Sequence, residues 1–202
     1  MALIHKATFL PRFIRQFLYL FFNRIVFWSA GVQYGKNMRV YNRLYLKKYS
    51  HSTFSVGDNL LICRGEGINP ICKNIKGSIF VNTNAKLLIG NNVGMSSPCI
   101  WCDNNIVIGN NVKLGGLVTL LDTDCHSLDY LNRRNTIKDV QNTKTSPVII
   151  EDDVLIGANS IVLKGVRIGA RTIVGAGSIV SSNLPPDCIA AGNPCKVIRD
   201  LK

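Results

Sequence analysis

The fold is decided by residues 150–181, which read IEDDVLIGANSIVLKGVRIGARTIVGAGSIVS. An aliphatic residue recurs at every sixth position of this stretch: Ile150, Ile156, Val162, Ile168, Val174 and Val180. A small or branched residue follows four positions after the first five of them: Val154, Ser160, Val166, Thr172 and Ser178. A period of six fits neither the α-helix, which repeats about every 3.6 residues, nor the simple alternation of a strand. It predicts a short strand and a tight corner, repeated, with the aliphatic side chain in a narrow core.

Three such sides would close one coil of a prism, and stacked coils would pair as parallel strands. The same phase recurs upstream around Ile89 and Ile108. It continues more weakly through Val56, Ile62 and Ile68. We therefore predict an all-β protein whose parallel β-helix spans residues 51–184.

The six-residue register fails over residues 122–147, which are polar. We expect this segment to be a loop extruded from the prism, and long loops on a rigid scaffold often carry function. Two prolines, Pro185 and Pro186, then end the repeat. We expect the tail, residues 185–202, to close with a short C-terminal helix.

Residues 1–50 differ in kind from the rest of the chain. They hold nine Lys and Arg, no Asp or Glu, and 12 of the 16 aromatic residues. Apolar residues recur there at helical spacing: Phe9, Phe13, Phe17, Phe21 and Ile25. This spacing predicts an N-terminal helical segment. The remaining residues carry 15 basic and 12 acidic side chains, so the chain as a whole is not expected to bind nucleic acid.

Three interpretations of this helix compete. A membrane span needs about 20 consecutive apolar residues, and Arg15 and Arg24 interrupt the run. A helix lying on an anionic membrane surface fits the composition. A helix packed on its own domain or on a neighbouring subunit fits it equally, and these two interpretations stay open. The interpretation as a membrane-surface helix predicts peripheral contact through residues 1–30, on the inner face of the cell membrane, for an otherwise cytoplasmic protein.

The seven cysteines are odd in number and irregularly spaced, which is typical of reduced thiols in a cytosolic protein. The pair Cys99 and Cys102 has the spacing of a metal-binding CxxC motif, but no second such pair accompanies it. We therefore expect no metal site.

Three segments carry a resemblance to a known family: residues 122–129 (DTDCHSLD), residues 154–160 (VLIGANS), and residues 175–180 (GAGSIV) continuing to residues 190–199 (AAGNPCKVIR). The chain resembles the hexapeptide-repeat acetyltransferases over about residues 55–201, most closely the galactoside and maltose acetyltransferases and the O-antigen and capsule O-acetyltransferases. This resemblance implies a left-handed β-helix, a homotrimer, and acetyl-CoA bound as co-substrate between neighbouring prisms. Residues 1–50 lie outside it.

The resemblance places the general base on His126. Histidine has an unperturbed pKa of about 6.5 and can take a hydroxyl proton at neutral pH, so the acceptor oxygen would attack the thioester directly. Asp124 and Asp129 either orient the imidazole, contact the acceptor or serve as turn residues.

The same resemblance assigns residues to the two substrates. The backbone N–H of Ala158 would hold the developing oxyanion. Other residues fall where the family contacts the cofactor's pantetheine arm, its nucleotide end and its phosphates: Ala176, Ser181, Ser182, Lys196 and Arg199. The acceptor pocket maps onto Ser96, Ser97, Asp103 and Asn104. Ser96 and Asn104 depart from the galactoside pattern, so the acceptor stays open.

Rival functions fit less well. A γ-type carbonic anhydrase needs three histidines on zinc, whereas this chain has only His5, which precedes the prism, His51, which lies at its margin, and His126. A serine acetyltransferase has a larger helical N-terminal domain, and a non-catalytic scaffold has no reason to extrude a loop. Cys125 could be a nucleophile, but no neighbour lowers its pKa. We predict an acetyl-CoA-dependent O-acetyltransferase acting on a sugar or on a surface glycan, such as an O-antigen or capsule precursor.

Overall fold

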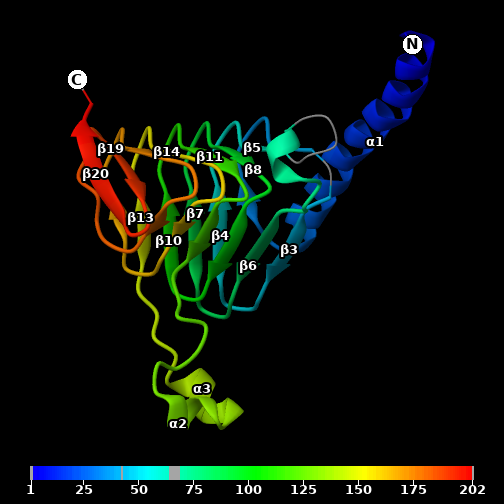
Figure 1. The fold of residues 1–202 in the computed structure, drawn as a ribbon. Coiled ribbons are helices and arrows are strands. Elements are labelled where there is room, and N and C mark those ends of the chain that lie inside the picture. The colour runs from blue at the N-terminus through cyan, green and yellow to red at the C-terminus, as the bar shows by residue number, and fades with distance from the viewer. Residues whose placement is uncertain (1, 42, 64–68, 202) are drawn as a thin grey trace.

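A computed structural model describes residues 2–41, 43–63 and 69–201, with side chains from residue 14 onward. The chain forms a three-sided prism with a helix across its N-terminal end and a loop hanging from its side (Figure 1). Three sheets of six, eight and six strands make the sides. Within each sheet the strands come from successive coils and pair in parallel, apart from the last strand. The predicted left-handed parallel β-helix is confirmed.

The three sides are called sheets A, B and C, in the order in which the chain visits them. Sheet A contains β1 (Gln33–Tyr34), β4 (Thr53–Val56), β7 (Lys86–Ile89), β10 (Asn105–Ile108), β13 (Val148–Ile150) and β16 (Arg167–Ile168). Sheet B contains β2 (Arg39–Val40), β5 (Leu61–Cys63), β8 (Gly94–Ser96), β11 (Lys113–Gly116), β14 (Leu155–Ile156), β17 (Ile173–Val174), β19 (Cys188–Gly192) and β20 (Cys195–Asp200). Sheet C contains β3 (Tyr45–Lys48), β6 (Ser78–Val81), β9 (Cys99–Cys102), β12 (Thr119–Leu121), β15 (Ile161–Val162) and β18 (Ile179–Val180).

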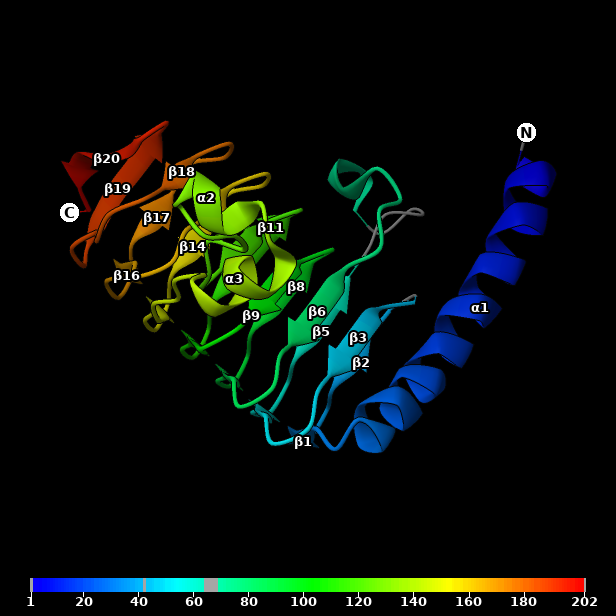
Figure 2. The same ribbon diagram turned by 90° about the horizontal axis from the view of Figure 1, so that it is seen from below.

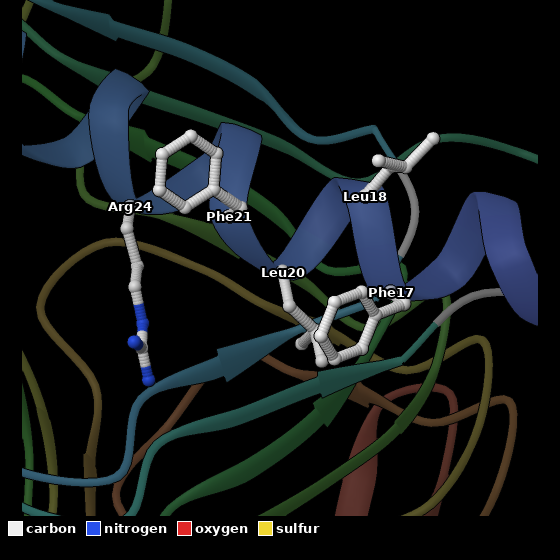
Figure 3. Close-up of a pocket in the computed structure, with 5 residues that line it drawn as sticks. All are labelled: Phe17, Leu18, Leu20, Phe21 and Arg24. Atoms are coloured by element: carbon white, nitrogen blue, oxygen red, sulfur yellow. The ribbon is translucent and has the colours of Figure 1, made fainter.

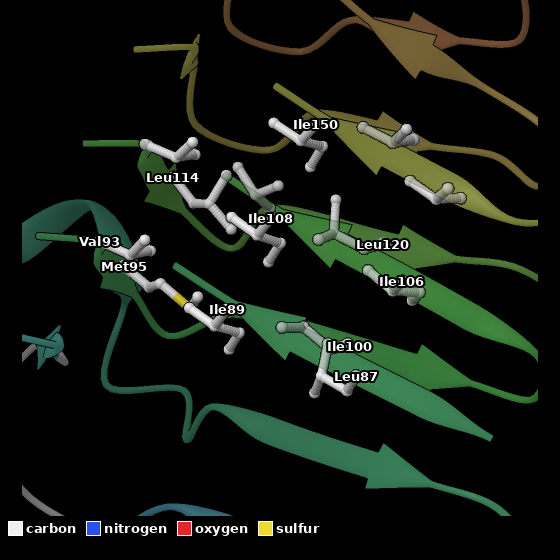
Figure 4. Packing of buried hydrophobic residues seen from close by; sticks show 14 of the residues in the cluster. Leu87, Ile89, Val93, Met95, Ile100, Ile106, Ile108, Leu114, Leu120 and Ile150 are labelled. Atoms are coloured by element: carbon white, nitrogen blue, oxygen red, sulfur yellow. The ribbon is translucent and has the colours of Figure 1, made fainter. Parts of the chain in front are cut away.

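The aliphatic residues that recur every six positions form the core. Register pairs those that are 18 positions apart: Ile150 with Ile168, Ile156 with Val174, and Val162 with Val180. Each of them is buried, and Figure 4 shows the same inward stacking in the central coils. Burying one such side chain contributes about 1.5–3 kcal/mol. Because every side of every coil buries such a side chain, these contributions together stabilise the closed prism.

One edge of the prism is held by a ladder of side-chain amides. Asn59, Asn92 and Asn111 stand at equivalent corners of successive coils with φ near 60°, a conformation that asparagine tolerates well. The amide of Asn59 donates to Asn92 at 2.8 Å, and Asn92 donates to Asn111 at 3.0 Å. Asn111 then donates to Asp153, again at 3.0 Å. Exposed corners are thereby tied along the prism axis.

The prism begins earlier than residue 51. β1, β2 and β3 form the first coil and pair with β4, β5 and β6. The helical segment is therefore only α1 (Ala2–Ser29), and the predicted boundary at residue 50 needs correction. Ile68, which was predicted to continue the repeat, lies outside the described residues.

The C-terminal end of α1 is fixed to the first coil. Phe27 is fully buried and packs against Phe54, with ring centroids 5.9 Å apart. The buried amide of Asn23 donates to the carbonyl of Val40 at 2.8 Å. The helix extends from this attachment beyond the prism (Figure 2).

Two segments leave the prism. Residues 122–147, between β12 and β13, contain α2 (Tyr130–Arg133) and α3 (Thr136–Gln141). A bridge between Thr123 and Thr145 closes the base of this loop. A second excursion, between β5 and β6, includes the short 3-10 helix η1 (Pro70–Cys72).

The predicted C-terminal helix is wrong. Residues 188–200 form an antiparallel hairpin of β19 and β20, and β19 extends sheet B by pairing with β17. Gly192 and Pro194 at the turn are the physical reason, because proline lacks the N–H that a helix interior needs and glycine disfavours a helix.

Candidate active site

His126 lies in the extruded loop, a short distance after the loop leaves sheet C. The backbone N–H of Asp124 donates to Lys144 O at 3.0 Å, so the outgoing and returning chains run together at the base. Cys125 then adopts a positive φ of 62°, which turns the chain before His126.

A carboxylate holds the imidazole. His126 Nδ1 lies 2.7 Å from Asp139 Oδ2, and the other oxygen, Asp139 Oδ1, accepts the Ser127 N–H at 2.7 Å. These bonds, first that of His126 and then that of Ser127, lower the pKa of Asp139. The carboxylate is therefore ionised, and an anion at Nδ1 favours the proton on that nitrogen. Nε2 is then left as the nitrogen that can accept a proton.

The pair is asymmetric in exposure. The His126 side chain is 70% exposed, whereas that of Asp139 is only 14% exposed. The imidazole is thus presented to solvent by a carboxylate that is itself fixed. Helix α3 fixes it: Asn135 caps the helix by accepting the N–H groups of Ile137 and Lys138, and the Thr143 hydroxyl donates to Asp139 O at 2.8 Å.

Asp139 was not predicted from the sequence. Neither Asp124 nor Asp129 forms a hydrogen bond or an ion pair with the imidazole of His126 in the described structure. Asp129 caps α2 by accepting the Leu131 N–H at 2.9 Å. Asp124 lies 3.4 Å from Lys164 Nζ. The orienting contact belongs to Asp139.

Two of the predicted acceptor residues stand at the base of the loop. The buried carboxylate of Asp122 accepts the N–H groups of Asp103 and Asn104, at 2.7 and 2.8 Å. Burial raises the pKa of Asp122. The Asn104 amide donates to Thr145 Oγ1 at 3.0 Å. Asp103 and Asn104 are therefore held rigidly where the loop begins.

The other two predicted acceptor residues lie elsewhere. Ser96 ends β8 and Ser97 follows it, so both stand before β9, whereas Asp103 and Asn104 stand after it. Ser97 is buried, and its hydroxyl donates to Ile75 O at 2.7 Å. Within one chain the four residues therefore lie at two different edges of the prism, one pair at each end of β9.

An aromatic stack on the outer face of sheet C was likewise not predicted from the sequence. Tyr45 stacks on Phe80, and Phe80 stacks on Trp101, with ring centroids 5.3 and 5.4 Å apart. The Trp101 indole N–H donates to Asp103 Oδ1 at 2.9 Å. The exposed ring of Trp101 is thereby fixed beside the loop base.

Two backbone N–H groups are available at the corner between sheets B and C. Ala158 and Ala176 occupy this corner in successive coils, and Gly177 N–H donates to Ala158 O at 2.8 Å. Within the described chain, the N–H groups of Ala158 and Ala176 donate to no acceptor. A Cβ on Gly115 would lie 2.5 Å from Ala158 N, so glycine is needed for coils to stack here. The corner can offer fixed donors to a ligand.

His126 and Ala158 do not meet within one chain. The loop leaves the carboxyl end of β12, and Ala158 precedes the amino end of β15, its neighbour in sheet C. At about 3.3 Å per strand residue, these two edges are on the order of 15 Å apart. Figure 1 shows α2 and α3 projecting away from the prism rather than back across sheet C.

The predicted cofactor residues of the tail cluster near that same corner. Lys196 pairs with Ala191 across the hairpin, and Gly175, beside Ala176, packs directly under Ala191. Lys196 and Arg199 are exposed on β20. Ser181 and Ser182 are also exposed, but they follow β18 and therefore lie at the opposite edge of sheet C, away from this corner.

The cysteines do not form a metal site. Cys99 faces outward and Cys102 inward on β9, so the CxxC pair is split between the two faces of the sheet. Among the described residues, no group of three His, Cys, Asp or Glu side chains could hold a metal ion. Burial, and then the carboxylates of Asp103 and Asp124, raise the pKa of the Cys125 thiol, which disfavours a thiolate nucleophile.

Comparison with known proteins finds hexapeptide-repeat acyltransferases. A family described as "hexapeptide repeat of succinyl-transferase" matches residues 147–182. The chain is 30% identical to a hexapeptide-repeat acetyltransferase of Vibrio cholerae, with a TM-score of 0.52 and coverage of 71% of this chain and 72% of that one. A second structure of that protein contains acetyl-CoA; it is 28% identical, with a TM-score of 0.53 and coverage of 85% and 72%.

Two further proteins are similar. A galactoside acetyltransferase in complex with coenzyme A is 26% identical, with a TM-score of 0.54 and coverage of 84% of this chain and 65% of that one. A tetrahydropyridine-dicarboxylate N-acetyltransferase of Staphylococcus aureus is 55% identical over 60 residues, which are 30% of this chain. The match spans only 25% of that curated relative.

Proposed function

This chain belongs to the hexapeptide-repeat acetyltransferases, and we propose that it transfers the acetyl group of acetyl-CoA to a hydroxyl of a sugar or surface glycan. The observation that carries this proposal is the exposed imidazole of His126 with its Nδ1 held by Asp139. A base that must reach a substrate needs one fixed nitrogen and one accessible nitrogen, and this pair supplies both.

In the proposed reaction the acceptor hydroxyl gives its proton to His126 Nε2 while its oxygen attacks the thioester carbonyl carbon. The negative charge that develops on the carbonyl oxygen is stabilised by the Ala158 N–H. The carbon–sulfur bond then breaks, and the imidazolium returns the proton to the leaving thiolate. Asp139 stabilises the imidazolium throughout, because its carboxylate stays ionised.

The residues at the corner between sheets B and C fit acetyl-CoA. The N–H groups of Ala158 and Ala176 are unsatisfied, and Lys196 lies beside them on β20. Amide donors suit the thioester carbonyl and the pantetheine amides, and a basic side chain suits a phosphate. The Vibrio cholerae relative was solved with acetyl-CoA and the galactoside acetyltransferase with coenzyme A, which supports acetyl-CoA as the donor. Arg199 would reach the nucleotide end from the same prism, whereas Ser181 and Ser182 would reach it only from the loop-bearing edge of the neighbouring prism.

We propose that two subunits of a homotrimer share each site. The base and the amide donor stand on opposite edges of sheet C, so they meet only if the loop of one prism reaches the free corner of the next. Subunit mixing tests this arrangement with two inactive variants, His126→Ala and Ala158→Pro, the second of which removes the N–H. Mixed trimers should regain activity because some sites contain neither change. If the mixture stays as inactive as its parents, while gel filtration shows intact mixed trimers, the sharing is disproved.

Trp101 favours a sugar as the acceptor. Its exposed ring is fixed by Asp103 at the base of the loop, and a flat ring with a carboxylate at its edge suits a sugar, which has apolar faces and hydroxyl edges. The Staphylococcus aureus relative is an N-acetyltransferase, so an amine acceptor is the second candidate, which on a sugar-binding site would be an amino sugar. Mild alkali distinguishes the two products, because it cleaves an O-acetyl ester and leaves an N-acetyl amide.

The test of the proposed activity is CoA release from acetyl-CoA with a panel of nucleotide sugars, glycan fragments and amino sugars. His126→Ala should lower turnover by about 10²–10⁴-fold, the usual contribution of a general base. Val140→Thr, which changes an exposed residue of the same loop, is the matched control and should keep its turnover. Near-normal turnover of His126→Ala would remove this residue from the mechanism.

A further inference from the structure

Large apolar side chains are exposed along the described part of α1. They are Ile14, Phe17, Leu18, Phe21, Phe22, Ile25 and Trp28. Trp28 is 74% exposed, and Phe17 and Phe21 are each 68% exposed. A helix that packed on its own domain through these residues would bury them. In this structure α1 faces the prism with its other side.

The exposed residues share one face. At about 100° per residue, all seven fall within an arc of about 140°. Asn23 and Phe27, which bind α1 to the first coil, lie on the opposite side of the helix. The apolar face is therefore directed away from the prism.

Basic residues border this face on both sides. By the same helical geometry, Arg24 lies just beyond Phe17 at one edge of the arc, and Arg15 lies just beyond Phe22 at the other. Phe17, Leu18, Leu20, Phe21 and Arg24 line a shallow groove on this part of the helix. Figure 3 shows the rings of Phe17 and Phe21 and the guanidinium of Arg24 projecting from the helix.

We propose that this face of α1 docks the protein on an anionic lipid surface, with the helix lying in the interface. Aromatic rings at the boundary between headgroups and acyl chains, flanked by arginines at the phosphates, are the arrangement that such a helix requires. No helix in the described chain combines the length and the apolarity needed to cross a bilayer.

Charge selects lipid as the occupant over a second copy of the chain. No acidic residue precedes Asp58, whereas nine basic residues precede residue 50. Two such segments repel each other when they pack face to face. An anionic surface attracts each basic residue, by about fivefold in binding per residue.

The rigid attachment of α1 sets how the prism stands on the lipid. Asn23 and Phe27 fix the helix to the first coil, so the N-terminal end of the prism lies at the membrane. The loop with His126 leaves the side of the prism further along its axis (Figure 1). Docking therefore leaves the proposed active site facing the aqueous phase next to the bilayer.

Co-sedimentation of the full chain with lipid vesicles tests the proposal. Vesicles of phosphatidylcholine with phosphatidylglycerol should bind the protein, and pure phosphatidylcholine vesicles should bind it more weakly. The double variant Phe17→Ser/Phe21→Ser should lose about 10-fold or more in binding, because each buried ring contributes strongly to partitioning. Arg24→Gln should lose about fivefold. Ile198→Ser, an exposed apolar change at the other end of the prism, is the control and should bind normally.

The outcomes separate the two occupants. Equal binding of the wild type and the double variant overturns the proposal, as does failure of the wild type to bind anionic vesicles. A fall in the solution mass of the double variant by light scattering, with no change in vesicle binding, would assign the face to a second copy. CoA release with a soluble acceptor should be unchanged in the double variant, so loss of docking is distinguishable from loss of the proposed activity.

Discussion

Asp139→Asn is the sharpest test of how the loop presents its base. Asp139 holds two donors at once: Oδ1 accepts the Ser127 N–H and Oδ2 faces His126 Nδ1, both at 2.7 Å. In the variant the amide oxygen would keep the Ser127 bond, because only oxygen can accept that N–H. The amide nitrogen would then face Nδ1 as a donor.

This reversal changes the tautomer of the ring. A donor opposite Nδ1 requires Nδ1 to accept, so the ring proton moves to Nε2, the nitrogen that receives the hydroxyl proton in the proposed reaction. A base held in the wrong tautomer loses most of its contribution, which is about 10²–10⁴-fold. Because the His126 side chain is 70% exposed, packing cannot restore its orientation. We expect a fall in kcat of about 10²–10⁴-fold with KM for acetyl-CoA little changed.

The assay is CoA release under saturating substrate, with Asp129→Asn as the companion variant. Asp129 accepts the Leu131 N–H as the cap of α2, and an asparagine caps equally well, so this variant should retain its turnover. Equal loss in both variants, or no loss in Asp139→Asn, would refute the assignment of the orienting role to Asp139.

The pKa of Asp139 adds a second readout. Because folding lowers this pKa from its ordinary value of 3.8, the ionised carboxylate stabilises the folded loop above pH 3.8. That stabilisation is lost as the pH falls through the lowered value. The difference in thermal stability between the wild type and Asp139→Asn should thus be full at neutral pH and vanish well below pH 3.8.

Three further predictions concern the prism and its thiols. Ile156→Ala should lower the free energy of unfolding by about 2–5 kcal/mol in urea titrations, because this side chain is fully buried; its exposed neighbour Leu155→Ala is the control. Gly157→Ala places a Cβ against Ala176 N. The variant should destabilise the prism by about 1–3 kcal/mol and raise KM for acetyl-CoA. An unchanged KM would show that Ala176 does not contact the cofactor. Cys125→Ser should keep its activity, and the wild-type thiol should react with disulfide reagents more slowly at neutral pH than a free cysteine, because its pKa is raised.

The sequence predicted the prism where its coils are regular. Ile150, Ile156 and Val162 recur every six positions because each must point into the same narrow core, so the period directly encodes the pairing with the next coil. The first coil escaped prediction because α1 covers its end. Its buried positions Val32, Met38 and Leu44 do stand six residues apart, but the aromatic and basic residues around them, such as Tyr34 and Arg39, hide the period.

The C-terminal hairpin escaped prediction for a different reason. Gly192 and Pro194 mark only the turn, and the composition of the flanking residues does not exclude a helix. What determines them is the open edge of sheet B at β17, which β19 covers. The need to cover this edge arises only in the assembled prism, so residues 188–200 show no six-residue period that would predict it.

The site was predictable only in part. His126 could be located because the register break and the neighbouring residues mark its loop. Asp139 could not, because the loop has no repeat and 13 residues separate the two side chains. The nearest signal was Asn135, a residue typical of helix caps, four positions before Asp139. Only the helix that Asn135 begins shows that the carboxylate returns to the imidazole.

The division of the site follows from how a three-sided prism is built. Every coil repeats the same three edges, so adding coils lengthens the prism without bringing the edge that bears the loop nearer to the corner of Ala158. Two complementary edges on one subunit are what a heterologous, ring-closing contact requires. Three prisms that each place the His126 edge against the Ala158 edge of the next would use both edges of every subunit and form three identical sites. The His126 loop projects from the prism because the amide corner that it serves belongs, on this proposal, to the neighbouring prism.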